Sequence, residues 1–244
     1  MTHLDRVMND LVIANRILAN EGVVDAYGHV SIRHPDHRDR YLLSRSRSPE
    51  LVTADDIMTF SLDSKVVGED KRPPYLERFI HGAIYAARPE INAVMHSHAK
   101  EVLPFTITST KLRPVVHSGS CIGAHIPVWD ISDKFGDTDM LVRDNEQGND
   151  LARCMGGDWV ALMRGHGFAA AGRSLFEVVR IGVYMPYNAR VYLEAMRMGE
   201  VKFLSAGEIA KRANWNPASP EMHRAWEYWA RRAGCADLLG ANAP

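Results

Sequence analysis

The stretch Ala93-Val94-Met95-His96-Ser97-His98 joins an apolar segment to two histidines. Its first four residues suit a short buried strand. Because His98 follows His96 by two residues, both imidazoles point to the same side of an extended backbone. Neutral imidazole is a common ligand of transition metals, so two imidazoles at one strand end make half of a metal site.

A third histidine follows another apolar segment. His166 lies in Arg164-Gly165-His166-Gly167, directly after Trp159–Met163. The flanking glycines permit tight backbone geometry and close approach of a bound group. A single HxH pair is a weak signal and often has no metal role. Two strand-then-histidine elements together favour a metal site with three histidines and an open fourth position, which is typical of catalytic sites.

The composition is that of an ordinary globular protein with one substantial core. The chain has 244 residues, 46% of them hydrophobic and 24% charged. It contains no linker-like or repeated segment, so a single domain is expected over residues 1–244, with an aromatic-rich tail from about 205 to 244. The 29 basic and 30 acidic residues give a net charge of −1, which indicates neither nucleic-acid nor membrane binding.

Cysteine usage and the amino-terminal segment suggest a cytoplasmic protein. Cys121, Cys154 and Cys235 are widely spaced, which fits reduced thiols better than a disulfide framework. Residues 1–20 contain no apolar signal core. No segment approaches the roughly 18 consecutive apolar residues of a membrane span.

Hydrophobic periodicity predicts an alternation of helices and strands. Helices are expected over residues 4–20, 53–56 (one turn), 75–87, 99–105, 149–155 and 174–198, and from 206 onwards. Strands are expected over residues 25–33 (entered through a glycine turn), 41–44, 58–62, 93–98, 159–163 and 168–171. The region 115–140 is expected to contain strands and loops. This order predicts an α/β fold with a central mixed sheet and helices on both faces.

Prolines and capping residues predict where several helices begin and end. Pro73-Pro74 is expected to open the helix over 75–87, and Pro104 to stop the helix over 99–105. Ser174 and Ser205 are expected N-caps. Pro186 is expected to kink the long helix.

The order of these motifs resembles the class II aldolase/adducin family. That family has an early G-N-x-S turn, a T-P-S-G-like loop, a glutamate opening a helix, an H-x-H strand end and a later histidine next to glycine. The matching stretches here are Gly28-His29-Val30-Ser31, Ser44-Arg45-Ser46-Arg47, Glu77, His96-Ser97-His98 and Gly165-His166-Gly167. The match extends from about Glu21 to Gly199.

The resemblance implies a class II aldolase-like fold, with a mixed or antiparallel central sheet, and a cofactor. His96, His98 and His166 would bind one divalent metal ion per subunit, Zn²⁺ or Mn²⁺. Glu77 would be the acid/base residue, although alone it would be explained as a first-turn glutamate favoured by the helix dipole. It also implies a homo-oligomer, a tetramer with sites between subunits.

Departures from the family pattern concern the substrate. Tyr75 and Leu76 stand where sugar-phosphate aldolases have phosphate-binding serines, and His29 replaces the early asparagine. Arginines that match planar carboxylates enter the T-P-S-G-like loop, although a solvated loop would also explain them. These changes resemble the branch of hydroxy-methylpyridine-dicarboxylate and dihydroxyphthalate decarboxylases. The residues expected to bind substrate are His29, Ser31, Arg45, Ser46 and Arg47.

The leading hypothesis is a metal-dependent decarboxylase of an aromatic hydroxy-dicarboxylic acid. A metal would accept the electrons left when CO₂ departs, and Glu77 or His117 would deliver the proton to the ring carbon. His117 follows an apolar pair, so a structural role stays open. The alternatives are an aldolase acting on a non-phosphorylated hydroxy-keto acid or sugar, and a non-catalytic adducin-like interaction domain. The remaining histidines are expected at the surface or in structural roles: His34, His37, His81, His125 and His223.

Overall fold

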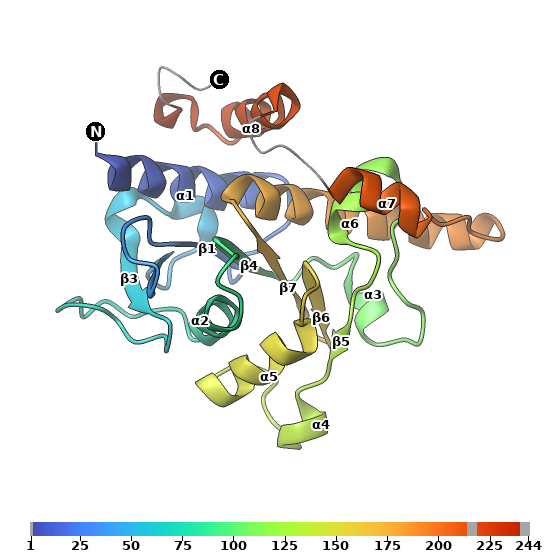
Figure 1. Ribbon diagram of the computed structural model, residues 1–244, viewed down its shortest axis with the longest axis horizontal. Coiled ribbons are helices and arrows are strands. Elements are labelled where there is room, and N and C mark those ends of the chain that lie inside the picture. Colours follow the sequence, from blue (N-terminus) through green and yellow to red (C-terminus); the bar gives the residue numbers. More distant parts are fainter. Residues whose placement is uncertain (1, 214–218, 240–244) are drawn as a thin grey trace.

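A seven-stranded sheet forms the centre of the protein (Figure 1). The computed structural model describes residues 2–213 and 219–239. The strands are β1 (His29–Arg33), β2 (Arg40–Ser44), β3 (Ile57–Ser61), β4 (Ala93–Ser97), β5 (Val128–Trp129), β6 (Val160–Met163) and β7 (Gly167–Gly172). Their order is β3-β2-β1-β4-β7-β6-β5, and every pair is antiparallel except β5 with β6. The expected mixed sheet is confirmed.

Helices cover both faces of this sheet, as expected (Figure 1). The α-helices are α1 (His3–Asn20), α2 (Arg78–Ala87), α3 (Leu103–Thr106), α4 (Ser132–Phe135), α5 (Asn145–Met155), α6 (Leu175–Met198), α7 (Ala206–Ala213) and α8 (Pro220–Arg232). Short 3₁₀ segments are η1 (Pro49–Leu51), η2 (Ala54–Asp56), η3 (His117–Ile122) and η4 (Ala236–Leu238). No helix in the described ranges is long and apolar enough to cross a membrane.

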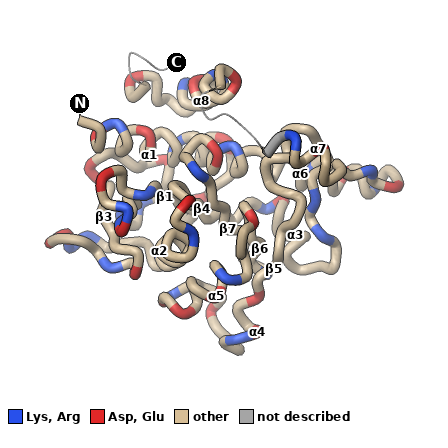
Figure 2. The backbone as a smooth tube through the Cα atoms, viewed as in Figure 1, with Lys and Arg blue, Asp and Glu red and all other residues tan. Residues whose placement is uncertain are grey.

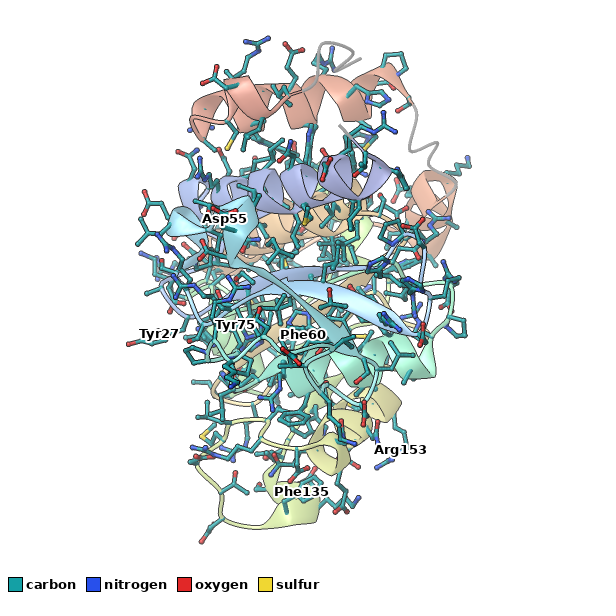
Figure 3. The ribbon with its side chains drawn as sticks, turned by 90° about the vertical axis from the view of Figure 1, so that its left-hand side faces the viewer. Tyr27, Asp55, Phe60, Tyr75, Phe135 and Arg153 are labelled. Carbon is teal, nitrogen blue, oxygen red and sulfur yellow. The ribbon has the colours of Figure 1, made fainter. Side chains whose placement is uncertain are left out.

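The alternation of side chains along β4 builds two cores. Ala93 and Met95 belong to the core shared with α1 and α6, whereas Val94 belongs to the core shared with α2 and α5. Side chains two residues apart on a strand share a face. His96 therefore lies on the same face as Val94, toward α2. Figure 3, turned from the first view, shows these layers stacked, with α8 outside α1.

Local capping chemistry holds several helices where the sequence predicts them. Ser174 accepts a hydrogen bond from Glu177 N, and Ser205 from Glu208 N. Thr53 caps η2 through a reciprocal bond with Asp56. α6 continues through Pro186 as one helix.

The aromatic tail packs against the body of the protein. Trp226 stacks on Phe176 with ring centroids 4.4 Å apart, and Trp229 meets Tyr184 edge to face. Both tryptophans are buried, whereas Tyr228 is exposed. Trp215, which the sequence analysis assigned to this tail, lies outside the described residues.

Two predicted helix boundaries are wrong. α2 begins at Arg78 rather than Tyr75, because Pro74 bridges to Arg45 and the Pro73 carbonyl accepts a hydrogen bond from Ser46 N. The prolines thus belong to an extended segment. Pro104 lies in the first turn of α3 instead of ending a helix, since proline lacks the N–H that this turn leaves unused.

Other expected elements differ in extent. α5 begins four residues earlier than predicted, because Asp144 caps it by accepting from Gln147 N. The 115–140 region contains the helical segments η3 and α4 besides the short strand β5. No disulfide joins Cys121, Cys154 or Cys235 in the described part of the chain. In the view of Figure 2, acidic and basic residues are interspersed along the described chain.

Arg33 joins the far end of β1 to the segment between α2 and β4. Its guanidinium donates to the carbonyls of Ile91, Tyr85, Arg88 and Arg38, at 2.6–3.1 Å. The side chain is buried, so water cannot replace these bonds. Two of the four carbonyls belong to the carboxyl end of α2, where unpaired carbonyls carry the negative end of the helix dipole.

We expect Arg33→Met to lower the free energy of unfolding by about 3 kcal/mol, because hydrogen bonds to a charged group are lost and buried carbonyls are left unpaired. Chemical denaturation measures the change. The exposed Arg38→Met is the matched control and should change stability by no more than about 0.5 kcal/mol. Equal effects of the two substitutions would contradict this role of Arg33.

Candidate metal centre

Strand register brings the three predicted histidines together. Ser97 of β4 pairs with Phe168 of β7, so the chain just before β7 lies beside the end of β4. Gly167 makes this approach feasible, because a Cβ there would lie 2.0 Å from the Ser97 carbonyl oxygen. His166 is thereby placed next to His96 and His98.

Each of these histidines has its Nδ1 atom occupied. His96 Nδ1 bonds the Phe168 carbonyl at 3.1 Å, and His98 Nδ1 lies 3.2 Å from Asp25 Oδ1. His166 Nδ1 bonds the Met140 carbonyl at 3.0 Å. Met140 has a φ of 67°, a left-handed conformation that is uncommon outside glycine. Carbonyls and carboxylates accept, so Nδ1 of each ring carries the proton and Nε2 carries a lone pair.

The three Nε2 atoms converge on one point. His98 Nε2 lies 2.9 Å from His96 Nε2 and 3.2 Å from His166 Nε2. Lone pairs at this separation repel one another unless a cation or a proton lies between them. The histidine arrangement therefore has the donor geometry of a metal site.

Glu77 completes the cluster from the start of α2. Its Oε1 accepts a hydrogen bond from Val142 N at 3.0 Å, which turns Oε2 toward His96 and His166, each at 3.5 Å. The four ligand atoms of Glu77, His96, His98 and His166 all lie within 4.8 Å of one another. Three imidazoles and a carboxylate fit a borderline divalent ion such as Zn²⁺ or Mn²⁺.

The protonation states suit a cation. Burial opposes ionisation of Glu77, but the imidazoles of His96 and His166 outweigh it and hold the pKa of this carboxyl well below its ordinary value. Burial, reinforced by His96, lowers the pKa of His98 to about 4. Burial also disfavours the charged form of His166, but the neighbouring Glu77 carboxylate raises the pKa of this imidazole. Glu77 is thus ionised and His98 neutral at neutral pH.

The cluster opens into a cavity of about 610 Å³. Glu77, His98 and His166 line one part of it, together with His29. The remaining lining residues are largely apolar: Tyr27, Ser46, Tyr75, Leu76, Asp139, Met140, Leu141 and Gly165. Tyr27 is 74% exposed and projects from the molecule, whereas Tyr75 is buried (Figure 3). This size and lining are typical of sites for small organic molecules.

The predicted substrate-binding arginines meet a common partner. Arg45 Nε lies 2.7 Å from Asp56 Oδ1, and Arg47 Nε lies 3.4 Å from Asp56 Oδ2. Ser46, between them, lines the cavity, but neither arginine is part of the lining. Two guanidinium groups share one carboxylate, which leaves a net positive charge beside Ser46.

His29 and Ser31 are placed differently from each other. His29 lies opposite His96 in the β1–β4 register and lines the cavity. Ser31 is fully buried and is not part of the lining. Its hydroxyl bonds His81 and Tyr85 instead.

His117 is not brought to the histidine cluster within the chain. It lies in η3 and lines a separate cavity of about 560 Å³ with residues of α6 and α8, among them Arg180 and Trp229. The predicted metal ligands and Glu77 therefore come together in one chain, whereas His117 does not join them.

Asp25 is not predicted from the sequence as a site residue, and His81 is predicted only at the surface or in a structural role. Asp25 orients His98 and also accepts bonds from Tyr27 N and Gly28 N. A signal for Asp25 was its position two residues before Tyr27 in a glycine turn, where aspartate commonly bonds the backbone. His81 follows Glu77 by four residues, a spacing that places both on one side of α2.

Comparison with known proteins gives consistent matches. The chain is 35% identical to the Decarboxylase tropJ of Talaromyces stipitatus, over 91% of this chain and 92% of that protein. It is 26% identical to the 3,4-dihydroxyphthalate decarboxylase of Arthrobacter keyseri, over 93% of each.

Among solved structures, an aldolase II superfamily protein from Pseudomonas syringae superposes with a TM-score of 0.79 at 20% identity, over 98% of this chain and 96% of that one. The model of the Class II Aldolase and Adducin N-terminal domain matches residues 9–193. The chain therefore belongs to the class II aldolase and adducin family.

Proposed function

We propose that the protein is a divalent-metal-dependent decarboxylase of an aromatic hydroxy-dicarboxylic acid, of the hydroxylated phthalate or pyridine-dicarboxylate type. The observation that carries the proposal is the convergence of three imidazole Nε2 atoms and Glu77 on one point at the wall of a largely apolar cavity. The relatives named as decarboxylases support the same reaction class.

His96, His98 and His166 would hold the ion, which would act as a Lewis acid toward oxygens of the substrate, with Glu77 beside it as the acid/base residue. Ionised Glu77 accepts the proton of the phenolic hydroxyl. The bond between the ring and the carboxylate then breaks, CO₂ leaves, and the electron pair stays on the ring carbon. Glu77 returns its proton to that carbon, so the product leaves as a phenolate and takes its last proton from solvent.

The lining of the cavity favours a flat aromatic substrate over a sugar phosphate. Tyr75 and Leu76 present ring and alkyl surfaces to the cavity, whereas a phosphate group would need small hydrogen-bond donors such as serine hydroxyls at these positions. The excess positive charge of Arg45 and Arg47 over Asp56 lies beside Ser46, where a second carboxylate of the substrate would be attracted.

The rival function is a metal-dependent aldolase that acts on a non-phosphorylated hydroxy-keto acid or sugar. It would use the same ion and Glu77. This alternative is supported by the solved structures of aldolases that share the fold. A non-catalytic adducin-like interaction domain is less consistent with the site, because such a domain has no need for converging imidazoles at an open cavity.

The metal assignment predicts that His96→Ala, His98→Ala and His166→Ala each lose most of the bound divalent metal and all decarboxylase activity, with the fold retained. Each substitution removes one Nε2 lone pair from the site. Elemental analysis after dialysis measures the metal. His125→Ala is the control, because His125 is an exposed histidine paired with Asp158. Full metal occupancy in all three cluster variants would refute the assignment.

The reaction assignment predicts CO₂ release from at least one member of a panel of hydroxylated phthalates and pyridine-dicarboxylates, including 3,4-dihydroxyphthalate. It also predicts that fuculose 1-phosphate is not cleaved. Cleavage of the sugar phosphate without CO₂ release from the panel would contradict the decarboxylase proposal and favour an aldolase.

The charge beside Ser46 can be tested in the same assay. Arg45→Ala and Arg47→Ala should each lower kcat/KM for the dicarboxylate about tenfold or more, since a charge-assisted bond is worth about 1.5–3 kcal/mol. Their metal content should match that of the parent. Arg72→Ala is the control, because Arg72 is neutralised by its own partner, Asp70. Two arginine variants with parental kinetics would exclude them from substrate binding.

We further propose a cytoplasmic homotetramer with sites between subunits. Cysteines that form no disulfide fit that compartment. Tyr27, Leu76 and Ile107 are large exposed hydrophobic residues, and the first two line the cavity, so a neighbouring subunit would cover them. We also infer that, if His117 takes part in the reaction, it acts on the substrate bound to a neighbouring subunit. Within its own chain, His117 lines a different cavity from the metal ligands.

Multi-angle light scattering at micromolar concentration should therefore give about four times the mass of one chain. Substituting Tyr27 by Asp should shift this mass downward, because a charge would be buried at the contact. The Leu51→Asp variant is the control, since Leu51 is exposed in η1 and lines neither cavity. A monomeric parent would rule out the assembly.

A further inference from the structure

A chain of four buried polar side chains leads from the wall of the metal cavity into the core. His29 Nδ1 lies 2.7 Å from His81 Nε2, and His81 Nδ1 lies 2.6 Å from Ser31 Oγ. Ser31 Oγ lies 2.8 Å from the Tyr85 hydroxyl. Each of the four side chains is at most 2% exposed. Their hydrogen bonds must therefore be satisfied within the protein.

The direction of the bond between His29 and His81 fixes the tautomers of both rings, because a neutral imidazole has one N–H and one lone pair. In one arrangement, Tyr85 donates to Ser31 and Ser31 donates to His81 Nδ1. The His81 proton lies on Nε2 and is donated to His29 Nδ1. The remaining proton of His29 then lies on Nε2, the nitrogen left for the cavity that His29 lines.

The opposite direction gives Tyr85 a poor acceptor. Its hydroxyl proton would go to the Asn92 carbonyl, which is 3.5 Å away and already accepts from Arg33 N at 2.7 Å. The other possibility is that Ser31 accepts from both Tyr85 and His81 Nδ1, and its own proton goes to the Val94 carbonyl, 3.4 Å away. Each of these two arrangements leaves a buried hydroxyl with a long bond, which costs free energy, whereas the first direction places each proton in a short bond. The chain therefore runs from Tyr85 toward His29.

We propose that Ser31, His81 and Tyr85 are positioning residues that hold His29 as the Nε2–H tautomer, so that His29 donates a hydrogen bond to an anionic oxygen of the substrate. This inference rests on the proposed function only for the substrate, whose carboxylate and phenolic oxygens accept hydrogen bonds. A lone pair of His29 at the same place would repel them.

The environment keeps both imidazoles neutral, as the chain requires. Burial lowers the pKa of His81 to about 3. Burial, with the neighbouring His81 and His96, also holds the pKa of His29 well below its ordinary value of 6.5.

Ser31→Ala should reverse the chain. Without the serine donor, His81 Nδ1 carries the proton and donates to the Val94 carbonyl, which lies within its reach. His81 Nε2 then accepts from His29 Nδ1, and His29 turns a lone pair toward the cavity. Long-range ¹H–¹⁵N spectra of the zinc-loaded, ¹⁵N-histidine-labelled protein report the tautomer, with His29→Gln identifying the signal.

The parent should show His29 protonated on Nε2, and Ser31→Ala should show it protonated on Nδ1. The KM for 3,4-dihydroxyphthalate should rise about tenfold or more in this variant, the usual loss for a hydrogen bond to a charged group, with unchanged zinc content. Ser64→Ala is the matched control: Ser64 is buried and bonds the Tyr41 phenol at 3.1 Å, but no chain leads from it to the cavity.

A parent His29 protonated on Nδ1 would overturn the inference, and so would a Ser31→Ala protein that keeps the Nε2–H tautomer. The parent spectrum decides by itself if the variant does not fold. The two proposals can fail separately. If the tautomer switches as expected but the protein decarboxylates no compound of the panel, the proposed reaction is wrong and the assignment of the His29 proton is still supported.

Discussion

The site depends on the antiparallel register of β4 with its two neighbours. Pairing with β1 sets His29 opposite His96, and pairing with β7 brings the turn that carries His166 to the end of β4. A shift by one residue would turn the His96 and His98 side chains to the opposite face, because strand side chains alternate. Gly167 secures the register, since a side chain there would collide with the Ser97 carbonyl.

Buried polar groups surround this register and restrict the arrangement of the site. Arg33 ties the carboxyl end of α2 to the segment before β4, and His81 ties the same helix to β1. Each bond replaces one that water would make in the unfolded chain, so its net contribution to stability is modest. The larger effect is on the position of α2, because a misplaced α2 would leave these buried groups unpaired. Since Glu77 directly precedes α2, the same bonds hold Glu77 beside the histidines.

Converging lone pairs and an ionised carboxylate make the cluster unfavourable without a positive charge. The outward nitrogen of each imidazole is held by a carbonyl or by Asp25, so the inward nitrogens cannot turn away. The apolar cavity beside them lowers the local dielectric and strengthens every electrostatic interaction of a bound substrate. This combination suits the Lewis-acid chemistry on a planar, anionic substrate that we propose.

The sequence by itself determined the strands, most helices, the three histidines and Glu77, because strand alternation, helix periodicity and cap residues act over a few neighbouring positions. Only the tertiary structure decided that α2 begins after Glu77, that Arg45 and Arg47 share Asp56, and that His117 lines another cavity. It also decided the bond between His29 and His81. These partners lie up to 52 positions apart, and strand register and helix packing bring them together.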